Sequence, residues 1–362
     1  MTPPHPTPAA LDPDLLRRIR TAEALHPRFA GFTPWYAQHL RPALARLQGS
    51  YWRRRILSLL LFVGGLVGAY ALYTGSEGLR ARLAGIEGWG GWLAFILGVL
   101  GAVLLVAAFA FAPMAGVKRR QAALAAGRIS EFLGLAHDAK GHGSPSLRPL
   151  WAAGLLPDSH GLRIAHSVRG EHAGVAFTSA SVALTRHQQR PRSTTHRTSI
   201  PFDGLVVQVA LPAAMSERPV PELPGLTAVR EAGAGAIAEE LWWGTTGSVE
   251  LTRFETGDVD FDGRFETRSS DPAAGARVLG ADLRRALTAL GECEGLQSLQ
   301  VKGLRVALVG RSATLAFSTP SRYLGSDAEA TVVASPLDPV HVERMLAQLA
   351  VVLSAVETLA KA

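Results

Sequence analysis

The stretches ILSLLLFVGGLVGAYALY, residues 56–73, and WGGWLAFILGVLGAVLLVAAFAFA, residues 89–112, decide how this chain is organised. Neither contains a charged residue. A helix of roughly 20 apolar residues crosses a bilayer core, and a backbone in lipid must satisfy its own hydrogen bonds. The pattern therefore predicts a transmembrane hairpin over residues 56–117, with a short polar loop between its two helices. A buried hairpin of a soluble protein is the alternative.

Basic and aromatic residues flank both stretches, in the pattern of membrane anchors. The predicted anchors are Arg53, Arg54, Arg55, Trp89, Trp92, Lys118, Arg119 and Arg120. Tryptophan prefers the headgroup level of a bilayer, and arginine and lysine accumulate on the cytoplasmic side. Both termini are therefore expected in the cytoplasm, as in a multi-pass protein of the bacterial inner membrane. A bacterial source is inferred because the chain lacks asparagine and has far more arginine than lysine.

The overall composition bears on the class of partner. The formal net charge is +7, and much of the excess lies beside the apolar stretches, where it favours anionic lipid headgroups. No basic run is interleaved with aromatic residues, so nucleic acid is not expected as a partner. Cys293 is the only cysteine, which excludes an intramolecular disulfide and a multi-cysteine metal site. The chain has no phosphate loop, nucleophile elbow or dinucleotide glycine fingerprint, so we expect no cofactor.

The segments on either side of the hairpin are expected to lie in the cytoplasm. Residues 1–13 are rich in proline, lack the apolar core of a signal peptide and are expected to be disordered. Residues 14–55 are expected to form juxtamembrane helices. The helix over residues 41–55 fits the membrane surface and fits equally a helix packed on the segment after the hairpin. Residues 118–149 are expected to form a helix and then a linker.

From residue 150 onward the pattern changes to short runs rich in Val, Leu, Phe and Thr, several of which alternate with polar residues. Such runs predict strands. The predicted strands cover residues 162–168, 173–187, 198–211, 248–254, 263–269, 299–309 and 313–318. Asp271–Pro272 and Asp338–Pro339 each place a capping residue before a proline, and an amphipathic helical pattern follows each pair. Residues 150–362 are therefore expected to form an independently folding α+β domain: an antiparallel sheet with an inserted helix and a C-terminal helix.

The segment FDGRFETRSSDPAAGARVL, residues 261–279, resembles the hallmark of the DUF3137 family of bacterial membrane proteins. Members of that family pair this segment with two upstream transmembrane helices. Phe261, Phe265, Asp271 and Pro272 are matching positions, whereas a threonine stands where the family usually has valine and the alanine–arginine pair is displaced by one. The resemblance implies a membrane-anchored protein of uncharacterised function and supplies no catalytic residue. We expect a structural role, with both phenylalanines on the core face of one strand and the aspartate capping the next helix.

Asp258, Asp260 and Asp262 alternate before a glycine, as in the first half of a calcium-binding loop. Ser269 stands where the closing bidentate glutamate is needed. A turn between strands is therefore the preferred interpretation, and no metal site is predicted here.

Histidines and arginines are numerous in the first predicted strands. The histidines are His160, His166, His172, His187 and His196. A metal site needs three or four convergent ligands, and no closely spaced pair is present, so solvated histidines are the preferred interpretation. The basic stretch 186–197 is expected to be a solvated hairpin loop, with contact to anionic lipid as the functional alternative. The pair Trp242–Trp243 is expected in the core rather than on a binding surface.

Three classes of function remain compatible with the sequence. The favoured one is a membrane-anchored binding or scaffold protein, whose cytoplasmic α+β domain recognises a protein or lipid partner. The second is an accessory subunit of a membrane complex, with the hairpin as the interface. The third is an enzyme acting at the membrane surface, which the absence of catalytic motifs makes less favoured.

Overall fold

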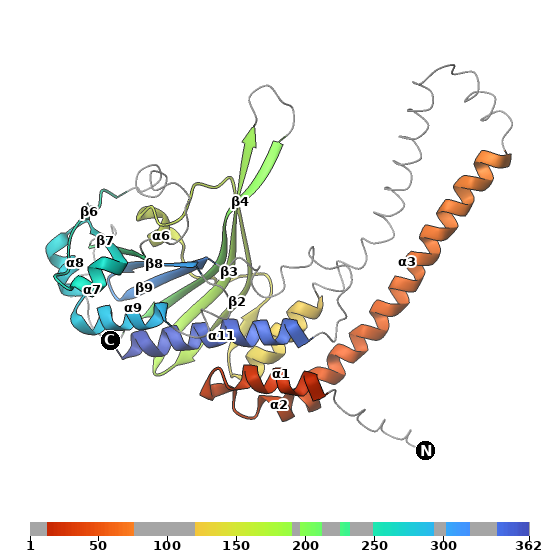
Figure 1. Cartoon of the computed structure of the whole chain (residues 1–362), viewed down its shortest axis with the longest axis horizontal. Coiled ribbons are helices and arrows are strands. Elements are labelled where there is room, and N and C mark those ends of the chain that lie inside the picture. Colours follow the sequence, from red (N-terminus) through yellow and green to blue (C-terminus); the bar gives the residue numbers. More distant parts are fainter. Residues whose placement is uncertain are drawn as a thin grey trace. The chain divides into compact units, whose positions relative to one another are not determined.

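The computed structural model describes residues 13–75, 120–189, 196–211, 225–231, 249–292, 302–318 and 339–361 (Figure 1). The chain divides into two compact units. The first unit comprises Met1–Ala37, Ala123–Asp327 and Pro339–Ala362, and the second comprises Gln38–Ala122 and Ala328–Asp338. The first unit is larger than the predicted domain over residues 150–362, because it includes a segment from each side of the apolar stretches.

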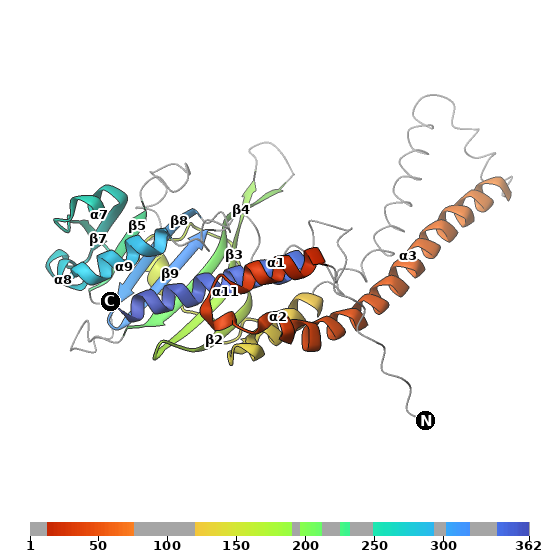
Figure 2. The same cartoon turned by 60° about the horizontal axis from the view of Figure 1, so that its bottom comes forward.

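A nine-stranded antiparallel sheet forms the centre of the first unit, counting the described residues (Figures 1 and 2). Its strands are β1 (Ala136–Asp138), β2 (Gly161–His172), β3 (Val175–Gln189), β4 (His196–Ala210), β5 (Thr227–Glu231), β6 (Thr252–Arg253), β7 (Phe265–Ser269), β8 (Lys302–Val309) and β9 (Ser312–Ser318). The strand order is β1-β2-β3-β4-β9-β8-β5-β7-β6. The predicted α+β class with an antiparallel sheet is therefore confirmed.

Seven of these strands correspond to predicted ones, because each has the alternation or the β-branched content on which the prediction rested. β8 and β9 pair in a hairpin, with Gly310 and Arg311 in the turn. Gly310 has a φ of 55°, a left-handed conformation that glycine adopts without strain. β3 and β4 extend further than predicted, since Gln189 pairs with His196. Within the stretch 186–197, residues 186–189 and 196–197 are thus strand, and residues 190–195 lie outside the described residues.

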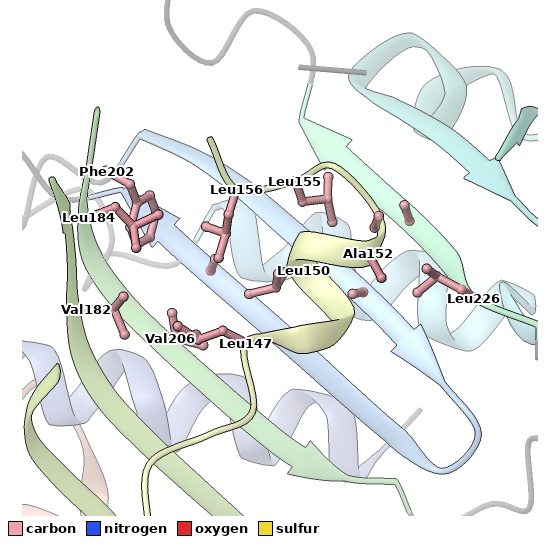
Figure 3. Packing of buried hydrophobic residues seen from close by; sticks show 14 residues of the cluster. Leu147, Leu150, Ala152, Leu155, Leu156, Val182, Leu184, Phe202, Val206 and Leu226 are labelled. Carbon is pink, nitrogen blue, oxygen red and sulfur yellow. The ribbon is translucent and has the colours of Figure 1, made fainter. Parts of the chain in front are cut away.

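One face of the sheet is covered by the short helix α6 (Arg148–Ala152) and the residues that flank it. Figure 3 shows this helix over the strands, with leucines directed at the sheet. The buried cluster includes Leu147, Leu150, Leu155, Leu156, Val182, Leu184, Phe202, Val206 and Leu226. Successive strand residues point to opposite faces, so Val207 and Val209, also fully buried, belong to the other face.

That other face is covered by α9 (Ala281–Gly291) and α11 (Pro339–Ala360), which contact each other (Figure 2). The predicted apolar stripe of the C-terminal helix is buried throughout: Val342, Met345, Leu346, Leu349, Leu353 and Val356. Val351 and Val352 are buried as well. The helix is apolar around most of its circumference because it contacts β2, β3 and β4 as well as the N-terminal helix α1 (Pro13–Glu23).

The motif around residue 265 differs from its predicted form. Phe261 lies in the short helix α7 (Val259–Arg264) and not in a strand, while Phe265 begins β7. Both side chains are nevertheless buried, and their rings stack with centroids 4.8 Å apart. The inserted helix is also broken in two, because α8 (Pro272–Val278) is followed by its C-cap, Leu279, and α9 starts after Gly280.

The N-terminal segment of the first unit packs on the end of the chain. After α1 it forms the 3-10 helix η1 (Pro27–Phe29) and the single turn α2 (Phe32–Trp35). Arg18 on α1 forms an ion pair with Glu343 on α11, at 2.7 Å. Phe32 contacts Phe132 edge to face, with ring centroids 5.3 Å apart, on the helix whose described part covers residues 120–132.

The second unit contains α3 (Arg41–Gly75), which follows the π-helical turn η2 (Tyr36–Leu40). The first apolar stretch is thus helical and continuous with the segment predicted as the juxtamembrane helix. Within the described ranges, no helix combines the length and the apolar character that a membrane crossing requires. This finding gives no support to the predicted hairpin. The second apolar stretch, its loop and residues 1–12 lie outside the described residues.

Candidate functional site

The predicted membrane anchors are only partly described. Arg53 lies exposed on α3, and Arg54 and Arg55 follow it on the same helix. Arg120 is the first described residue of the helix over 120–132 and is exposed. The other predicted anchors, Trp89, Trp92, Lys118 and Arg119, lie outside the described residues, as do Trp242 and Trp243.

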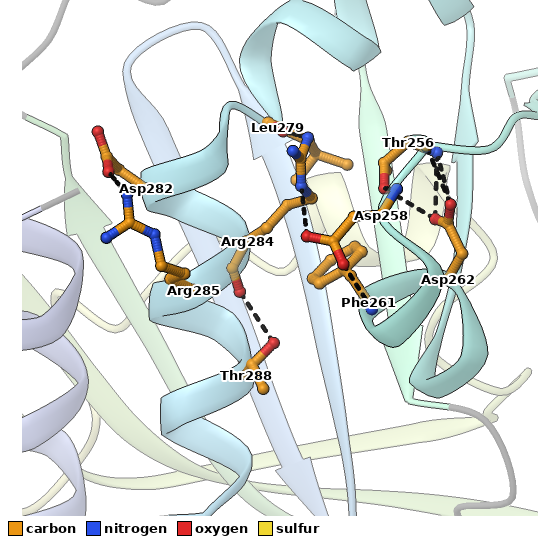
Figure 4. A network of polar contacts seen from close by, with 10 residues as sticks. Thr256, Asp258, Phe261, Asp262, Leu279, Asp282, Arg284, Arg285 and Thr288 are labelled. Carbon is orange, nitrogen blue, oxygen red and sulfur yellow. Dashed lines mark hydrogen bonds and ion pairs between the residues drawn. The ribbon is translucent and has the colours of Figure 1, made fainter.

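The acidic stretch 258–262 is occupied by local hydrogen bonds (Figure 4). Asp258 Oδ1 accepts from the backbone N–H of Phe261 at 3.2 Å and caps α7, and its Oδ2 lies 3.3 Å from Nε of Arg284. Both carboxylate oxygens of Asp262 accept the backbone N–H of Thr256, at 3.1 and 3.0 Å. These carboxylates hold a loop and a short helix in place, so the arrangement does not provide the convergent free oxygens that calcium requires.

The second half of the motif also has a structural arrangement. Asp271 is the N-cap of α8, because its Oδ1 accepts from the backbone N–H of Ala274 at 3.1 Å, and Pro272 is the first helical residue. Ser269 Oγ accepts from the N–H of Asp271 and lies 3.1 Å from Thr227 Oγ1 on the neighbouring strand β5. All these side chains serve packing and capping.

Two of the predicted histidines pair with histidines that the sequence pattern did not single out. His166 Nδ1 lies 3.3 Å from Nε2 of His137, with the rings stacked at 5.6 Å. Burial lowers the pKa of His166 to about 4, with a smaller contribution from the neighbouring His137. His172 meets His26 edge to face, with ring centroids 5.3 Å apart. His160 is exposed before β2, and His187 and His196 lie on β3 and β4.

The second of these pairs belongs to a polar cluster that joins three elements of the first unit. His26 precedes η1, His172 ends β2, and Glu357 lies near the C-terminal end of α11. One nitrogen or carboxylate oxygen from each residue lies within 4.8 Å of the other two. His26 is buried, and the other two are half-buried. We refer to His26, Arg28, His172 and Glu357 as the histidine–glutamate cluster.

Arg28 determines which nitrogen of each ring carries the proton. Its backbone N–H donates to Nδ1 of His26 at 3.1 Å, and its Nη1 lies 3.2 Å from Nδ1 of His172. A backbone amide and a guanidinium can only donate. Both Nδ1 atoms must therefore be acceptors, and both neutral rings carry their proton on Nε2.

The Nε2–H group of His26 lies beside the carboxylate of Glu357. Both Nε2 atoms are buried and have no hydrogen-bond partner among the described residues. Nε2 of His26 lies 3.7 Å from a carboxylate oxygen of Glu357, which is beyond direct hydrogen-bond distance. A donor and an acceptor at this separation form a site that a bridging water would satisfy.

The separation of the ligand atoms also suits a metal such as zinc, but the hydrogen-bond pattern does not fit one. A metal at Nε2 requires a lone pair there, so the proton must move to Nδ1. Ligating histidines donate this second N–H to a carboxylate, a carbonyl or water. Here each Nδ1 faces a donor of Arg28 instead. The cluster therefore does not have the surroundings of a metal centre.

The charges around the cluster disfavour protonated histidine. Burial lowers the pKa of His26, and the neighbouring His172 and Arg28 lower it further, while Glu357 acts in the opposite direction. Burial and then Arg28 lower the pKa of His172, again opposed by Glu357. The pKa of Glu357 is itself lowered, first by a hydrogen bond from Lys361. At neutral pH the cluster thus consists of two neutral rings, one carboxylate and one guanidinium.

The sequence contained no local signal for this site. Its members come from the beginning, the middle and the end of the chain, and only His172 was among the candidates. Comparisons with protein-family models, with curated proteins and with solved structures find no match to this chain. The likeness to the DUF3137 family therefore stays a prediction from the motif.

Proposed function

We propose that the protein is a membrane-anchored binding or scaffold protein, whose α+β unit presents a surface to a protein or lipid partner. In this proposal the stretches 56–73 and 89–112 form the membrane hairpin, and both termini lie in the cytoplasm of a bacterium. The resemblance to the DUF3137 family supports the same architecture. No described helix meets the requirements of a membrane span. The structural support for the proposal is the set of exposed apolar side chains on α3.

The apolar part of α3 exposes an unusual concentration of large hydrophobic side chains. Seven of the ten such residues among the described ones lie on this helix: Trp52, Ile56, Leu57, Leu59, Leu60, Val63 and Val67. Their exposed fractions range from 47% to 64%. At 100° per residue they cover an arc of about 160°. A continuous apolar surface of this kind on a protein in water marks a contact with lipid or with another protein.

Along one side of α3, exposed basic residues are followed by exposed aliphatic residues. Arg46, Arg53, Leu60 and Val67 follow one another at intervals of seven residues and so lie on nearly the same side of the helix. The first two are exposed cations and the last two are exposed aliphatic residues. Trp52 lies at the transition, where a bilayer has its headgroups. This order supports insertion of α3 from the arginine side, with the N-terminus in the cytoplasm.

Membrane fractionation tests the proposal. We expect the full-length protein to stay in the membrane pellet after an alkaline carbonate wash, which releases peripheral proteins. Replacing Leu60 and Val63 by lysine should release a substantial fraction, because a lysine at the centre of a span costs about 2.5–3.5 kcal/mol. Ala45→Lys is the matched control, since Ala45 is exposed on the same helix before the apolar part. Full release of the unmodified protein by the wash would contradict the proposal.

The exposed arc of α3 also fits an accessory subunit whose partner helices cover it. Purification in a mild detergent separates the two possibilities. A stoichiometric membrane partner that is lost in the Leu60→Lys variant would favour the accessory subunit. If the protein purifies without a partner, this would favour lipid as what contacts the exposed side chains of α3. Reporter fusions after residue 361 and within residues 74–88 should report opposite sides of the membrane.

A further inference from the structure

The histidine–glutamate cluster connects the N-terminal segment of the first unit to its sheet and to its last helix. Arg28 extends the connection, because its Nη1 also donates to the carbonyl of Glu171 at 3.1 Å and its Nη2 to the carbonyl of Leu133 at 2.6 Å. One arginine thus joins η1, the end of β2 and the end of the helix over residues 120–132. The two hydrogen bonds from Arg28 to the rings depend on both Nδ1 atoms acting as acceptors.

Protonation of either ring removes that acceptor. An imidazolium carries a proton on both nitrogens and can only donate. A proton on Nδ1 of His26 would point at the backbone N–H of Arg28 and abolish the cap of η1. A proton on Nδ1 of His172 would point at the guanidinium of Arg28, adding a second positive charge at a distance of 3.2 Å. The folded arrangement therefore accommodates only neutral rings.

The charged groups that face the rings are few, and most of them have the wrong sign to compensate. Arg28, on η1, faces both rings. His26, before η1, and His172, at the end of β2, also face each other. Glu357, on α11, is the one acidic side chain of the described residues that acts on the rings. This carboxylate is itself hydrogen-bonded to Lys361 at 3.1 Å. It moderates the repulsion but does not remove the donor–donor conflict at Nδ1.

We propose that the histidine–glutamate cluster is a pH-sensitive switch, which holds residues 13–35 on β2 and α11 at neutral pH and releases them when the rings are protonated. The ligand of the switch is the proton, and no metal or other cofactor is required. The segment that is released leads along the chain through η2 into α3. The inference does not depend on the proposed membrane function.

Hydrogen exchange of the full-length protein in a mild non-ionic detergent tests this proposal. Exchange of the backbone amides in residues 16–35 is compared at pH 7.5 and pH 5.0, after correction for the intrinsic pH dependence of exchange. We expect about tenfold faster corrected exchange at pH 5.0, because the open state binds protons on the two rings more tightly than the closed state does. Peptides from α9 serve as the internal reference and should show no such change.

Three variants separate the switch from a merely structural role. In His26→Asn/His172→Asn, each amide oxygen occupies roughly the position of Nδ1 and accepts from Arg28, but it does not titrate. We expect this variant to lose the difference between the two pH values. Glu357→Gln should enlarge the difference, because the carboxylate is the group that stabilises the protonated rings. His142→Asn, which changes an exposed histidine outside the cluster, should behave like the unmodified protein.

Two results would overturn the proposal. One is equal corrected exchange of residues 16–35 at both pH values in the unmodified protein. The other is an unchanged pH difference in the double asparagine variant, which would place the titrating group elsewhere. The ratio between the two pH values remains informative even if the double variant is less stable overall, since a lost cap would raise exchange at both.

Discussion

The guanidinium Nη1 of Arg28 lies 3.2 Å from Nδ1 of His172, in an arrangement where only the ring nitrogen can accept. The backbone N–H of the same arginine caps η1 through Nδ1 of His26. One residue therefore sets the tautomer of two histidines that come from different elements. The proton positions are a consequence of hydrogen-bond chemistry, and they can be measured directly.

The first prediction concerns these tautomers. In protein labelled with ¹⁵N-histidine, two-bond correlation spectra at pH 7.5 should show the protonated nitrogen of His26 and His172 at Nε2. His26→Asn and His172→Asn assign the two signals by their loss. Protonation of Nδ1 in either ring would contradict the hydrogen bonds on which the pH-sensitive switch rests.

The second prediction is that zinc does not stabilise the protein through this cluster. A ligand that binds only the folded state raises the melting temperature with its concentration. Because each Nδ1 faces a donor, we expect the same melting temperature with zinc chloride at micromolar concentration as with a chelator. A zinc-dependent rise that His26→Asn/His172→Asn abolishes would show that the rings change tautomer and bind the metal.

The third prediction concerns pH and stability. The folded state lowers the pKa of His26, His172 and His166, mainly by burial. A histidine whose pKa is lower in the folded state does not reduce the free energy of unfolding at pH values above its pKa in the unfolded chain, about 6.5. Stability is lost as pH falls from about 6.5 toward the folded pKa, because the unfolded state then binds more protons. Chemical denaturation at a series of pH values should show this decline between about pH 6.5 and 4.

In the same series, removing His166 separates the contribution of its pair with His137. His166→Asn should leave the decline that comes from the histidine–glutamate cluster. Loss of the whole decline in this single variant would show that the pH dependence comes from the pair of His137 and His166, and not from the histidine–glutamate cluster.

The fourth prediction is that the phenylalanine pair carries much of the stability around α7. Phe261 and Phe265 are each only 2% exposed, and a buried phenylalanine replaced by alanine typically costs about 3–5 kcal/mol. Either substitution should lower the free energy of unfolding by an amount in that range. Val259→Ala is the control, because Val259 is 86% exposed on the same short helix and should change it little. Equal effects of the three substitutions would mean that α7 is not packed as described.

Asp258 and Asp271 cap helices, whereas Asp260 does not. Asp271→Ala and Asp258→Ala should each cost roughly 1 kcal/mol, because each removes the N-cap of a helix. Asp260→Ala should be nearly neutral, since Asp260 is exposed and caps no described helix. Added calcium should leave all melting temperatures unchanged. A calcium-dependent rise that Asp258→Ala removes would restore the metal interpretation.

Much of the sheet could be predicted because its long strands repeat with a period of two. β5 was missed because its five residues, Thr227–Glu231, include two charged side chains and alternate only weakly. The predicted strand around Phe261 was wrong because a spacing of four residues fits one face of a helix as well as one face of a strand. The capped helix turn places Phe261 over the ring of Phe265 without any strand alternation.

The histidine–glutamate cluster could not have been predicted from local patterns. His26 was not among the candidates, because a histidine before Pro27 and Arg28 resembles an ordinary loop residue. Glu357 lies on the half-exposed side of an otherwise apolar helix, where acidic residues are common and need no special explanation. The contact between them arises from the packing of α1 and α11, which only the tertiary structure specifies.

The last prediction concerns the boundary of the sheet-containing unit. A fragment of residues 150–362 lacks α1, the helix over residues 120–132 and β1, which pairs with β2 along the edge of the sheet. Ile19 on α1 and Ile129 are fully buried in the complete unit, so the fragment loses their packing and exposes the surface of α11 that α1 contacts. We expect a lower melting temperature than that of the full chain and binding of a dye that reports exposed apolar surface. A fragment of residues 120–362 restores β1 and the helix before it, and should recover part of the loss. A cooperative melt of the shorter fragment at the temperature of the full chain would show that the N-terminal segment adds no stability to the sheet.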